Sequence, residues 1–443
     1  MTIAYLEDRA LPASYYESVV GVRERYAPLV SDASYDVCIV GAGLAGLQTA
    51  YALSSRGLSV VVLEANRVGW GASGRNGGQV IPEFACGMSY LESALGMPQA
   101  QSCYRLLVQG ANEVALQVEA LGIDCEFQRG HLETAVTPQH AAPLKAWVEH
   151  ARKHYGGTQR FIRREDLGEH IQSNRYYGGI LDMEGGHLDP LRYTLGLAKG
   201  VVAQGGVIHE DSPLVSWHEG AGVVVQSTFA VVKAKTLILA CNVGIDNLAG
   251  EPAKQLSRRI LPVATWIVAT APLGAELASQ LLPTRVAVAD NRAALDYFRL
   301  SADNRLIFGG GASYLGDTSP DGHTEELRRN MRATFPVLSD IRIDYTWGGI
   351  LDATMSRAPN LGTVSDNVFH LQGFSGSGLV STAVAGRAVA DAVTGSGENF
   401  QMFSRLPHRN FPGGRLLRGP IVSIAKTWVR TRDKLRIWGL NRT

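Results

Sequence analysis

The sequence predicts an α/β (α+β) fold in which a Rossmann-like domain, built from discontinuous segments, is joined to a second domain with a large, mostly antiparallel sheet. Three observations carry this prediction. A β-branched run, Val37–Val40, leads into a glycine-rich turn and then into helical sequence. A second strand–loop–helix unit with its own glycine cluster occupies 368–393. Between these units, alternating apolar stretches such as 263–269 indicate antiparallel strands.

The first glycine cluster is typical of a dinucleotide-binding turn. Gly41 permits the tight turn, Gly43 lets a pyrophosphate approach the backbone, and Gly46 lets the helix pack closely on the strand. The next strand, Leu58–Leu63, ends at Glu64, whose carboxylate can accept hydrogen bonds from both hydroxyls of an adenosine ribose. The unit therefore predicts a dinucleotide without a 2′-phosphate, and both NAD and FAD satisfy that description.

A second glycine cluster, 69–78, follows the strand that ends at Glu64, and its composition decides between these cofactors. It contains almost no side chain that would block a flat ring, while Ser73, Arg75 and Asn76 supply polar anchors. This composition suits a loop whose backbone lies against a flavin better than it suits an ordinary surface loop. We therefore predict FAD as the cofactor.

Later segments are expected to meet the same cofactor. The apolar strand 236–244 runs into a small-residue loop at Cys241 and Asn242, at the edge of the sheet where a dinucleotide binds. The loop Gly373–Gly378 precedes a small-residue helix, 379–393, so its N–H groups point at negative charge. Such a helix start would stabilise the negative charge that a reduced flavin develops.

The order of these segments predicts how the chain divides into domains. The FAD-binding domain is expected to be interrupted by the segments of the substrate domain, and a basic tail ends the chain. The predicted boundaries are an N-terminal arm at 1–33, an FAD-binding domain at 34–86, 185–245 and 346–398, a substrate domain at 87–184 and 246–345, and a C-terminal tail or helix at 399–443.

Composition excludes several other classes of protein. The 443 residues are 45% hydrophobic and 19% charged, which suits a globular protein with large cores. The five cysteines show no CxxC or paired metal spacing, so we expect reduced thiols, no metal and a cytoplasmic location. The first residues lack the pattern of a signal peptide, and no stretch reaches the ~18 apolar residues of a spanning helix.

Charge is unevenly distributed along the chain. The formal net charge of +1 argues against a nucleic-acid partner, but 405–443 holds ten Lys and Arg residues against the single acid Asp433. An apolar stripe at roughly helical spacing crosses this tail. We interpret it as a helix that docks on its own chain or on a second subunit, with peripheral membrane contact as the alternative. The stripe consists of Ile421, Ile424, Trp428, Leu435 and Trp438.

The chain resembles the D-amino-acid-oxidase-like FAD oxidoreductases of the glycine and sarcosine oxidase type, and within them the γ-glutamylputrescine oxidoreductases. The likeness covers nearly the whole chain. It is carried by Gly41–Gly46, Gly71–Gly78, Gly185–Pro190, Asp296–Arg299, Trp347, Ser356–Gly362, Gly373–Gly378, and the ending Leu406–His408 with Phe411–Arg415.

This resemblance implies oxidation of an amine by hydride transfer to flavin N5. The imine would hydrolyse to an aldehyde and ammonia, and O2 or another acceptor would reoxidise the flavin. The resemblance places the backbone of Leu214 at the adenine and Cys241 with Asn242 at the diphosphate. Together with the motifs, it gives the expected FAD contacts: Gly41, Gly43, Leu44, Ala45, Gly46, Glu64, Ala65, Ala72, Ser73, Arg75, Asn76, Gly77, Gly78, Gln79, Leu214, Cys241, Asn242, Gly373, Phe374, Ser375, Gly376, Ser377, Gly378 and Leu379.

Three departures from the family pattern bear on the substrate and the flavin. Leu351 stands where amino-acid oxidases of the family carry an arginine that holds the substrate α-carboxylate. The stretch 352–357 lacks the cysteine that links the flavin in the sarcosine-oxidase branch, so we expect FAD to be bound without a covalent link. Ile307 stands where that branch has a lysine that activates oxygen. Oxidase and dehydrogenase both stay open, with the oxidase favoured.

Substrate contacts are expected from an aromatic wall. Tyr297, Trp266 and Trp347 could keep the amine desolvated, although aromatic residues in strands are often plain core. Alternation places Asp296 on the strand face opposite Tyr297. With Leu351, these aromatics are the expected catalytic-site residues. The expected substrate is γ-glutamylputrescine or a related long-chain amine, with another amine or an N-methyl amino acid as the alternative and a non-catalytic flavoprotein as a third hypothesis.

Overall fold

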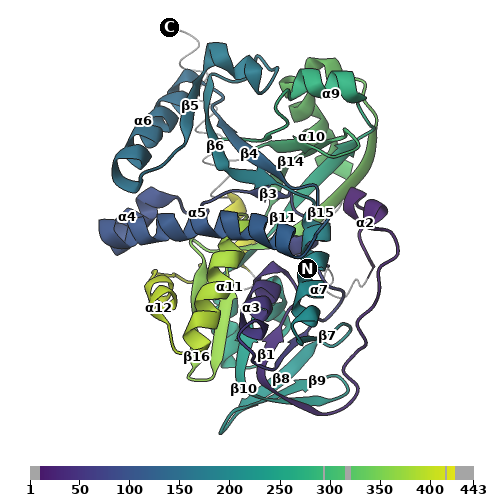
Figure 1. Ribbon diagram of the computed structural model, residues 1–443, viewed down its shortest axis with the longest axis vertical. Helices are drawn as coiled ribbons and strands as arrows, with labels where there is room; N and C mark the ends of the chain where they lie inside the picture. The colour runs from purple at the N-terminus through teal and green to yellow at the C-terminus, as the bar shows by residue number, and fades with distance from the viewer. Residues whose placement is uncertain (1–9, 293–294, 315–320, 415–416, 425–443) are drawn as a thin grey trace.

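A computed structural model describes residues 10–292, 295–314, 321–414 and 417–424, and Figure 1 shows that they form two sheets at opposite ends of an elongated molecule. Within these residues, eight strands form the first sheet, in the order β16-β17-β10-β1-β2-β7 with β8 and β9 continuing from β10. Their bounds are β1 Ala33–Val40, β2 Val60–Leu63, β7 Val207–His209, β8 Leu214–Glu219, β9 Val223–Ser227, β10 Val231–Leu239, β16 Asn360–Ser365 and β17 Val368–Gln372.

The first sheet is parallel at its centre, where β17, β10, β1, β2 and β7 run in one direction. The last four residues of β1 and all four of β2 are buried, which explains their unbroken apolar sequence. Three helices cover one face of this sheet, as Figure 1 shows, and share one apolar core with it. These helices are α3 Leu44–Ser54, α7 Pro190–Ala203 and α11 Leu379–Val393.

Nine described strands form the second sheet, in the order β15-β11-β14-β13-β12-β4-β6-β3, with β5 also paired to β6. Only the β12–β4 pair among them is parallel. The predicted α/β (α+β) fold with a second, mostly antiparallel sheet is thus confirmed. The strands are β3 Gln79–Val80, β4 Gln128–Thr134, β5 Arg160–Arg163, β6 Gly178–His187, β11 Leu261–Thr270, β12 Ala287–Asp290, β13 Tyr297–Leu300, β14 Leu306–Ser313 and β15 Ile343–Ala353.

Of the remaining helices, α12 and α8 pack beside the first sheet, and the others lie around the second sheet or between the two sheets. The long helix α5 crosses the middle of the molecule between the sheets in Figure 1. The α-helices are α2 Tyr15–Val20, α4 Met88–Leu95, α5 Met97–Ala120, α6 Pro138–Tyr155, α8 Glu251–Arg258, α9 Ala275–Leu281, α10 Asp321–Thr334 and α12 Glu398–Ser404, and the 3-10 helices are η1 Ala72–Gly74, η2 Arg164–Glu169, η3 Asn242–Asn247 and η4 Pro336–Leu338.

The chain crosses between the sheets within segments that the sequence assigns to one domain. β15 belongs to the second sheet, although the predicted FAD-binding segment begins at residue 346 inside it. β6 likewise ends at His187, just past the predicted boundary at 185. Both strands carry residues toward the space between the sheets. The domain boundaries therefore stay a prediction. Near residues 185 and 346, strands β6 and β15 of the second sheet extend across the predicted boundaries.

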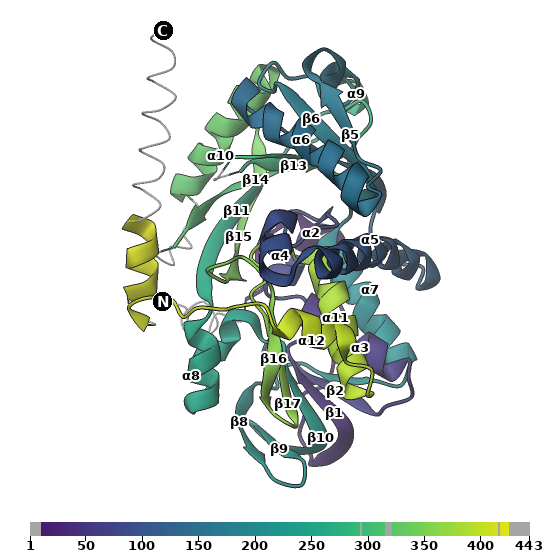
Figure 2. The same ribbon diagram turned by 90° about the vertical axis from the view of Figure 1, so that its left-hand side faces the viewer.

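The described part of the C-terminal segment packs on the second sheet. Phe411 and Val422 join an apolar cluster with Leu261 and Val263 of β11. Figure 2 shows 417–424 on the same side of the molecule as α8 and β11. Ile421 and Ile424, from the predicted stripe, remain 38% and 72% exposed. Its other members, Trp428, Leu435 and Trp438, lie outside the described residues. Among the described helices, none is long and apolar enough to cross a membrane.

Candidate functional site

A cavity of about 1630 Å³ lies between the two sheets. One part of its wall comes from the C-terminal ends of β1, β2 and β10 and from the start of α11, and another part comes from strands β4, β12, β13 and β15 of the second sheet. The ends of parallel strands and the start of a helix are where open α/β sheets bind dinucleotides. The cavity therefore marks the candidate site.

The turn between β1 and α3 is built for close backbone packing. Gly41 has φ of 107°, which favours glycine, and a Cβ there would lie 2.5 Å from the carbonyl oxygen of Ala240. A Cβ on Gly46 would lie 1.9 Å from the carbonyl oxygen of Gly41. Gly43 has an extended backbone and is the N-cap residue of α3, so this position provides no side-chain cap. Gly43, Leu44 and Ala45 at the start of this helix line the cavity.

Glu64 follows β2 and lines the cavity. Its two carboxylate oxygens accept hydrogen bonds from the backbone N–H groups of Ala42, at 2.7 Å, and Asn66, at 2.9 Å. Burial raises the pKa of Glu64 despite these hydrogen bonds. Each carboxylate oxygen can accept a further hydrogen bond, so the group is suited to hold a ribose hydroxyl as well.

The glycine-rich segment after β2 is held by its own polar side chains. Ser73 Oγ accepts the backbone N–H of Leu44 at 2.8 Å, which joins this segment to the start of α3. Asn76 Oδ1 accepts the N–H of Gly78 at 2.8 Å, while its amide donates back to Ala72 and Ser73. These bonds fix a loop whose backbone faces the cavity.

Arg75 reinforces the same loop. Its Nε donates to the carbonyl oxygen of Trp70 at 2.6 Å, and its guanidinium lies 4.5 Å from the centre of the Trp70 ring. A further N–H reaches the carbonyl oxygen of Gly348 in β15 at 3.3 Å. Arg75 therefore connects the glycine-rich segment 69–78 to the second sheet.

The loop before α11 is anchored by Asp352. Its Oδ2 accepts the N–H of Gly373 at 2.6 Å, and its backbone carbonyl accepts the N–H of Ser375 at 3.0 Å. Burial raises the pKa of Asp352 to about 6, and the N–H groups of the loop oppose that rise. The N-cap residue of α11, Gly378, provides no side-chain cap, so the first N–H groups of this helix are available to an anionic ligand.

One buried polar atom at the cavity has no protein partner. The Oδ1 atom of Asn242 is buried without a hydrogen bond from any described residue, while its Nδ2 donates to Ile350 at 3.3 Å. Asn242 has φ of 48°, an unusual conformation for a non-glycine residue that is frequent at ligand sites. An unpaired acceptor, two helix starts and a ribose-type carboxylate around one cavity are a donor and acceptor set that fits FAD.

The structure places most of the predicted FAD contacts at this cavity. Gly46, Gly78 and Gly373 lie behind its surface, where a Cβ would collide with Gly41, Leu188 or Thr354. The predicted residues that line it are Gly41, Gly43, Leu44, Ala45, Glu64, Ala65, Ala72, Ser73, Arg75, Asn76, Gly77, Gln79, Leu214, Cys241, Asn242, Phe374, Ser375, Gly376, Ser377, Gly378 and Leu379.

The expected aromatic wall is only partly at the cavity. Tyr297 and Leu351 line the cavity. The ring of Tyr297 lies between Gly77 and Gly309, and a Cβ on these glycines would come within 2.4 and 2.2 Å of it. Trp347 is 3% exposed and instead donates to the carbonyl oxygen of Arg75 at 3.0 Å. Trp266 points to the other face of β11 and stacks on His323. The structure therefore does not bring either tryptophan to the cavity.

Sequence reasoning missed a group of ionisable cavity residues. Glu83, His131, Glu133, Asp182 and Arg357 all line the cavity. The alternation of His131 and Glu133 around the buried Leu132 was the available signal for two of them. Arg357 has φ of 62°, which the sequence does not reveal.

Comparison with known proteins agrees with this geometry. A model of the family described as "DAO: FAD dependent oxidoreductase" matches residues 36–392. The chain belongs to this family of FAD-dependent oxidoreductases. It is 35% identical to the "Gamma-glutamylputrescine oxidoreductase" of Escherichia coli strain K12, over 96% of this chain and 99% of that protein.

Two further relatives agree with the assignment. The "Probable oxidoreductase OrdL" of Haemophilus influenzae is also 35% identical, over 96% of this chain and 97% of its own length. The crystal structure of glycine oxidase from Geobacillus kaustophilus superposes with a TM-score of 0.69 at 20% identity, covering 82% of this chain and 95% of that one. The latter likeness establishes the fold alone. The enzyme is therefore an FAD-dependent oxidoreductase with the DAO-type fold.

Proposed function

We propose that this oxidoreductase oxidises a primary amine, and that γ-glutamylputrescine or a related long-chain amine is its substrate. The observation that carries the proposal is the 35% identity to the γ-glutamylputrescine oxidoreductase of E. coli across almost both whole chains. The uncharged Leu351 at the cavity supports it, because this side chain cannot form an ion pair with a carboxylate next to the oxidised carbon.

FAD bound in the cavity would supply the hydride acceptor for this reaction. The loops around Gly43, Ser73 and Gly376 would hold it, with Glu64 at the ribose. Tyr297 and Leu351 would limit the access of water to the bound amine, which favours the neutral amine that hydride transfer requires. Burial raises the pKa of Tyr297, so its phenol stays protonated at neutral pH. The imine product would then hydrolyse to an aldehyde and ammonia.

The purified enzyme should be yellow, and acid precipitation should release the flavin as FAD. We expect this because the stretch 352–357 contains no cysteine for a covalent link. Chromatography of the supernatant identifies the flavin. Flavin that stays with the precipitated protein would contradict the non-covalent part of the proposal, and colourless protein that FAD cannot reconstitute would contradict the site itself.

Turnover should be faster with γ-glutamylputrescine than with glycine, sarcosine or D-alanine. The reason is that Leu351 provides no positive charge for the carboxylate of these amino acids. Peroxide formation measures oxidase activity, and reduction of a dye measures activity with another electron acceptor. The ratio of the two rates also decides between oxidase, which we favour, and dehydrogenase. Faster turnover of any of the three amino acids would reverse the proposed substrate order.

A further inference from the structure

Three carboxylates share one region of the cavity wall, and we call Glu83, Glu133 and Asp182 the acidic wall. Glu133 of β4 lies opposite Ile180 of β6, and the neighbouring His131 lies opposite Asp182. Residues directly opposite in antiparallel strands share a face. His131, Glu133 and Asp182 therefore lie on one face of the second sheet, and all three line the cavity.

The other face of these strands belongs to the core of the second sheet. Leu132 and Leu181 alternate with the acidic wall and are buried in the apolar cluster beneath it. The strand register is consequently fixed by apolar burial. A one-residue slip, which would take the carboxylates out of the cavity, would also expose these leucines.

Asp182 is held in place by neighbouring groups. Its Oδ2 accepts the amide of Gln159 at 3.1 Å, and its Oδ1 accepts the N–H of Glu184 at 2.9 Å. Gln159 in turn donates to the hydroxyl of Tyr104 at 2.8 Å. Burial raises the pKa of Asp182 in spite of these hydrogen bonds. This carboxylate is therefore positioned for a role at the cavity.

Glu83 reaches the same region from a turn beside α11. Its carbonyl oxygen accepts the hydroxyl of Ser377 at 2.7 Å, which places its backbone beside the loop before that helix. Glu83 is exposed, and it lines the cavity. Desolvation and repulsion by Glu133 and Asp182 raise the pKa of Glu83 to about 7, and Arg357 opposes the rise.

His131 provides a separate indication of a ligand. It is only 5% exposed, it lines the cavity, and its Nε2 has no hydrogen-bond partner in the described part of the chain. Burial lowers its pKa to about 4, so the ring is neutral at physiological pH and one of its nitrogens is an acceptor. An unpaired buried imidazole next to three carboxylates points to a missing hydrogen-bonding partner.

No protein cation forms an ion pair with the acidic wall in the described part of the chain, although Arg357 lies near enough to oppose the raised pKa of Glu83. Arg292, which also lines the cavity, instead pairs with Asp290 and Asp296. Asp182 is buried and has hydrogen-bond partners, whereas no described residue donates a hydrogen bond to the carboxylates of the exposed Glu83 or the half-buried Glu133. A cationic ligand would supply the charge that the protein does not.

We propose that the acidic wall and His131 form a subsite that captures the amino group of the substrate in its protonated form, before that group loses its proton and is oxidised as the neutral amine. This inference rests on the proposed amine oxidation and adds the residues that select the substrate. The carboxylates and the His131 nitrogen accept the N–H groups of the ammonium. The same charges repel a carboxylate next to the bound amino group and so disfavour simple amino acids.

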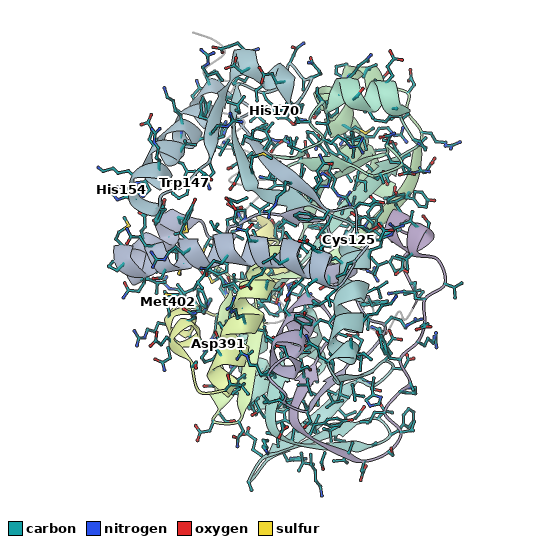
Figure 3. The ribbon with its side chains drawn as sticks, viewed as in Figure 1. Cys125, Trp147, His154, His170, Asp391 and Met402 are labelled. Carbon is teal, nitrogen blue, oxygen red and sulfur yellow. The ribbon has the colours of Figure 1, made fainter. Side chains whose placement is uncertain are left out.

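The surroundings of this subsite suit an alkyl chain attached to the ammonium. Leu144 and Trp147 of α6 and Tyr104 of α5 line the cavity together with the acidic wall. Trp147 is labelled on α6 in Figure 3. Methylene groups packed on these side chains would leave water, while the amino group would stay with the carboxylates. A long-chain alkylamine matches both parts.

The test uses the FAD-loaded enzyme and the variants Glu83→Gln and Glu133→Gln, with Glu119→Gln as a matched control at the exposed end of α5. Three quantities are measured: KM and kcat for γ-glutamylputrescine, and the Kd of butyltrimethylammonium from the change in flavin absorbance. This quaternary cation cannot form an imine, so it reports binding alone. Loss of one charged hydrogen bond should raise KM by about tenfold or more. The quaternary cation has no N–H group, so its Kd should rise because one negative charge of the subsite is lost.

The outcomes separate the inference from the proposed function. We expect kcat to change much less than KM, FAD absorbance to match wild type, and Glu119→Gln to leave all values unchanged. Butyltrimethylammonium that binds wild type but not the variants supports the subsite even if γ-glutamylputrescine is not oxidised. Unchanged KM and Kd in FAD-loaded Glu83→Gln and Glu133→Gln, or no binding of the cation to wild type, would overturn it. Glu83 lies outside the sheet, so its variant serves if Glu133→Gln does not fold.

Discussion

Replacement of Gly46 by alanine should leave the enzyme largely without FAD. The added Cβ would lie 1.9 Å from the carbonyl oxygen of Gly41 and 3.4 Å from the side chain of Ile39. Because the nearest atom is backbone, α3 must move away from β1 or the turn between them must change. Either shift displaces the start of α3, which lines the cavity. Overpacking of about 3 kcal/mol corresponds to roughly hundredfold weaker FAD binding.

Gly322→Ala is the matched control for this variant. Gly322 also lies within a helix, α10, and a Cβ there would meet no atom within 4 Å. Alanine has the higher helix propensity, so the control should be as stable as wild type or slightly more stable. FAD content per protein, from the ratio of flavin to protein absorbance after dialysis, is the measurement. Full FAD content in Gly46→Ala would mean that the turn does not form the cofactor site.

The glycine-rich loops could be predicted because their constraints are local. Gly41 needs a positive φ, and Gly46 has no room for a Cβ, so both residues are determined within one strand–turn–helix unit. The same holds for Gly373, with φ of 77°. Glu64 follows the second strand at the position where such a unit meets a ribose. Short-range geometry of this kind is visible in the sequence, and the cavity lies where it predicts.

The positions of the tryptophans in the expected aromatic wall could not be predicted from the sequence. Alternation correctly places Asp296, which pairs with Arg175 and Arg292, opposite Tyr297, which lines the cavity. Alternation cannot say which face of a strand meets the cavity when both faces are buried. β11 has apolar neighbours on each side, and Trp266 packs on the side of α10. The side that a buried tryptophan occupies is decided by helices elsewhere in the chain.

The acidic wall could not be found from the sequence for a different reason. Glu83, Glu133 and Asp182 lie about 50 residues apart along the chain, on a turn and on two strands. Each one alone reads as an ordinary surface carboxylate. Only the pairing of β4 with β6 and the contact of the turn with α11 bring them to one cavity. Long-range packing therefore determines the part of the site that we expect to select the substrate.

Replacement of Arg418 by alanine should destabilise the enzyme by about 3–5 kcal/mol, because it leaves a buried carboxylate without its cation. Arg418 is 4% exposed. Its guanidinium donates to the carbonyl oxygens of Ser257, at 2.6 Å, and Ile260, at 2.9 Å, and it pairs with Asp246. These contacts hold Arg418 against α8 and η3, while docking of the apolar stripe stays a prediction. Urea unfolding of wild type and variant measures the loss.

Arg409→Ala is the control, because Arg409 belongs to the same basic segment but is exposed. It should change stability by less than about 0.5 kcal/mol. In the double variant Arg418→Ala/Asp246→Ala the loss should be smaller than the sum of the two single losses, since removing both partners leaves no unpaired buried charge. Equal losses in the Arg418 and Arg409 variants, or strict additivity in the double variant, would show that the contact with Asp246 does not secure the tail. The basic charge would then remain available for another surface, and vesicle co-sedimentation at low and high salt would test whether that surface is a membrane.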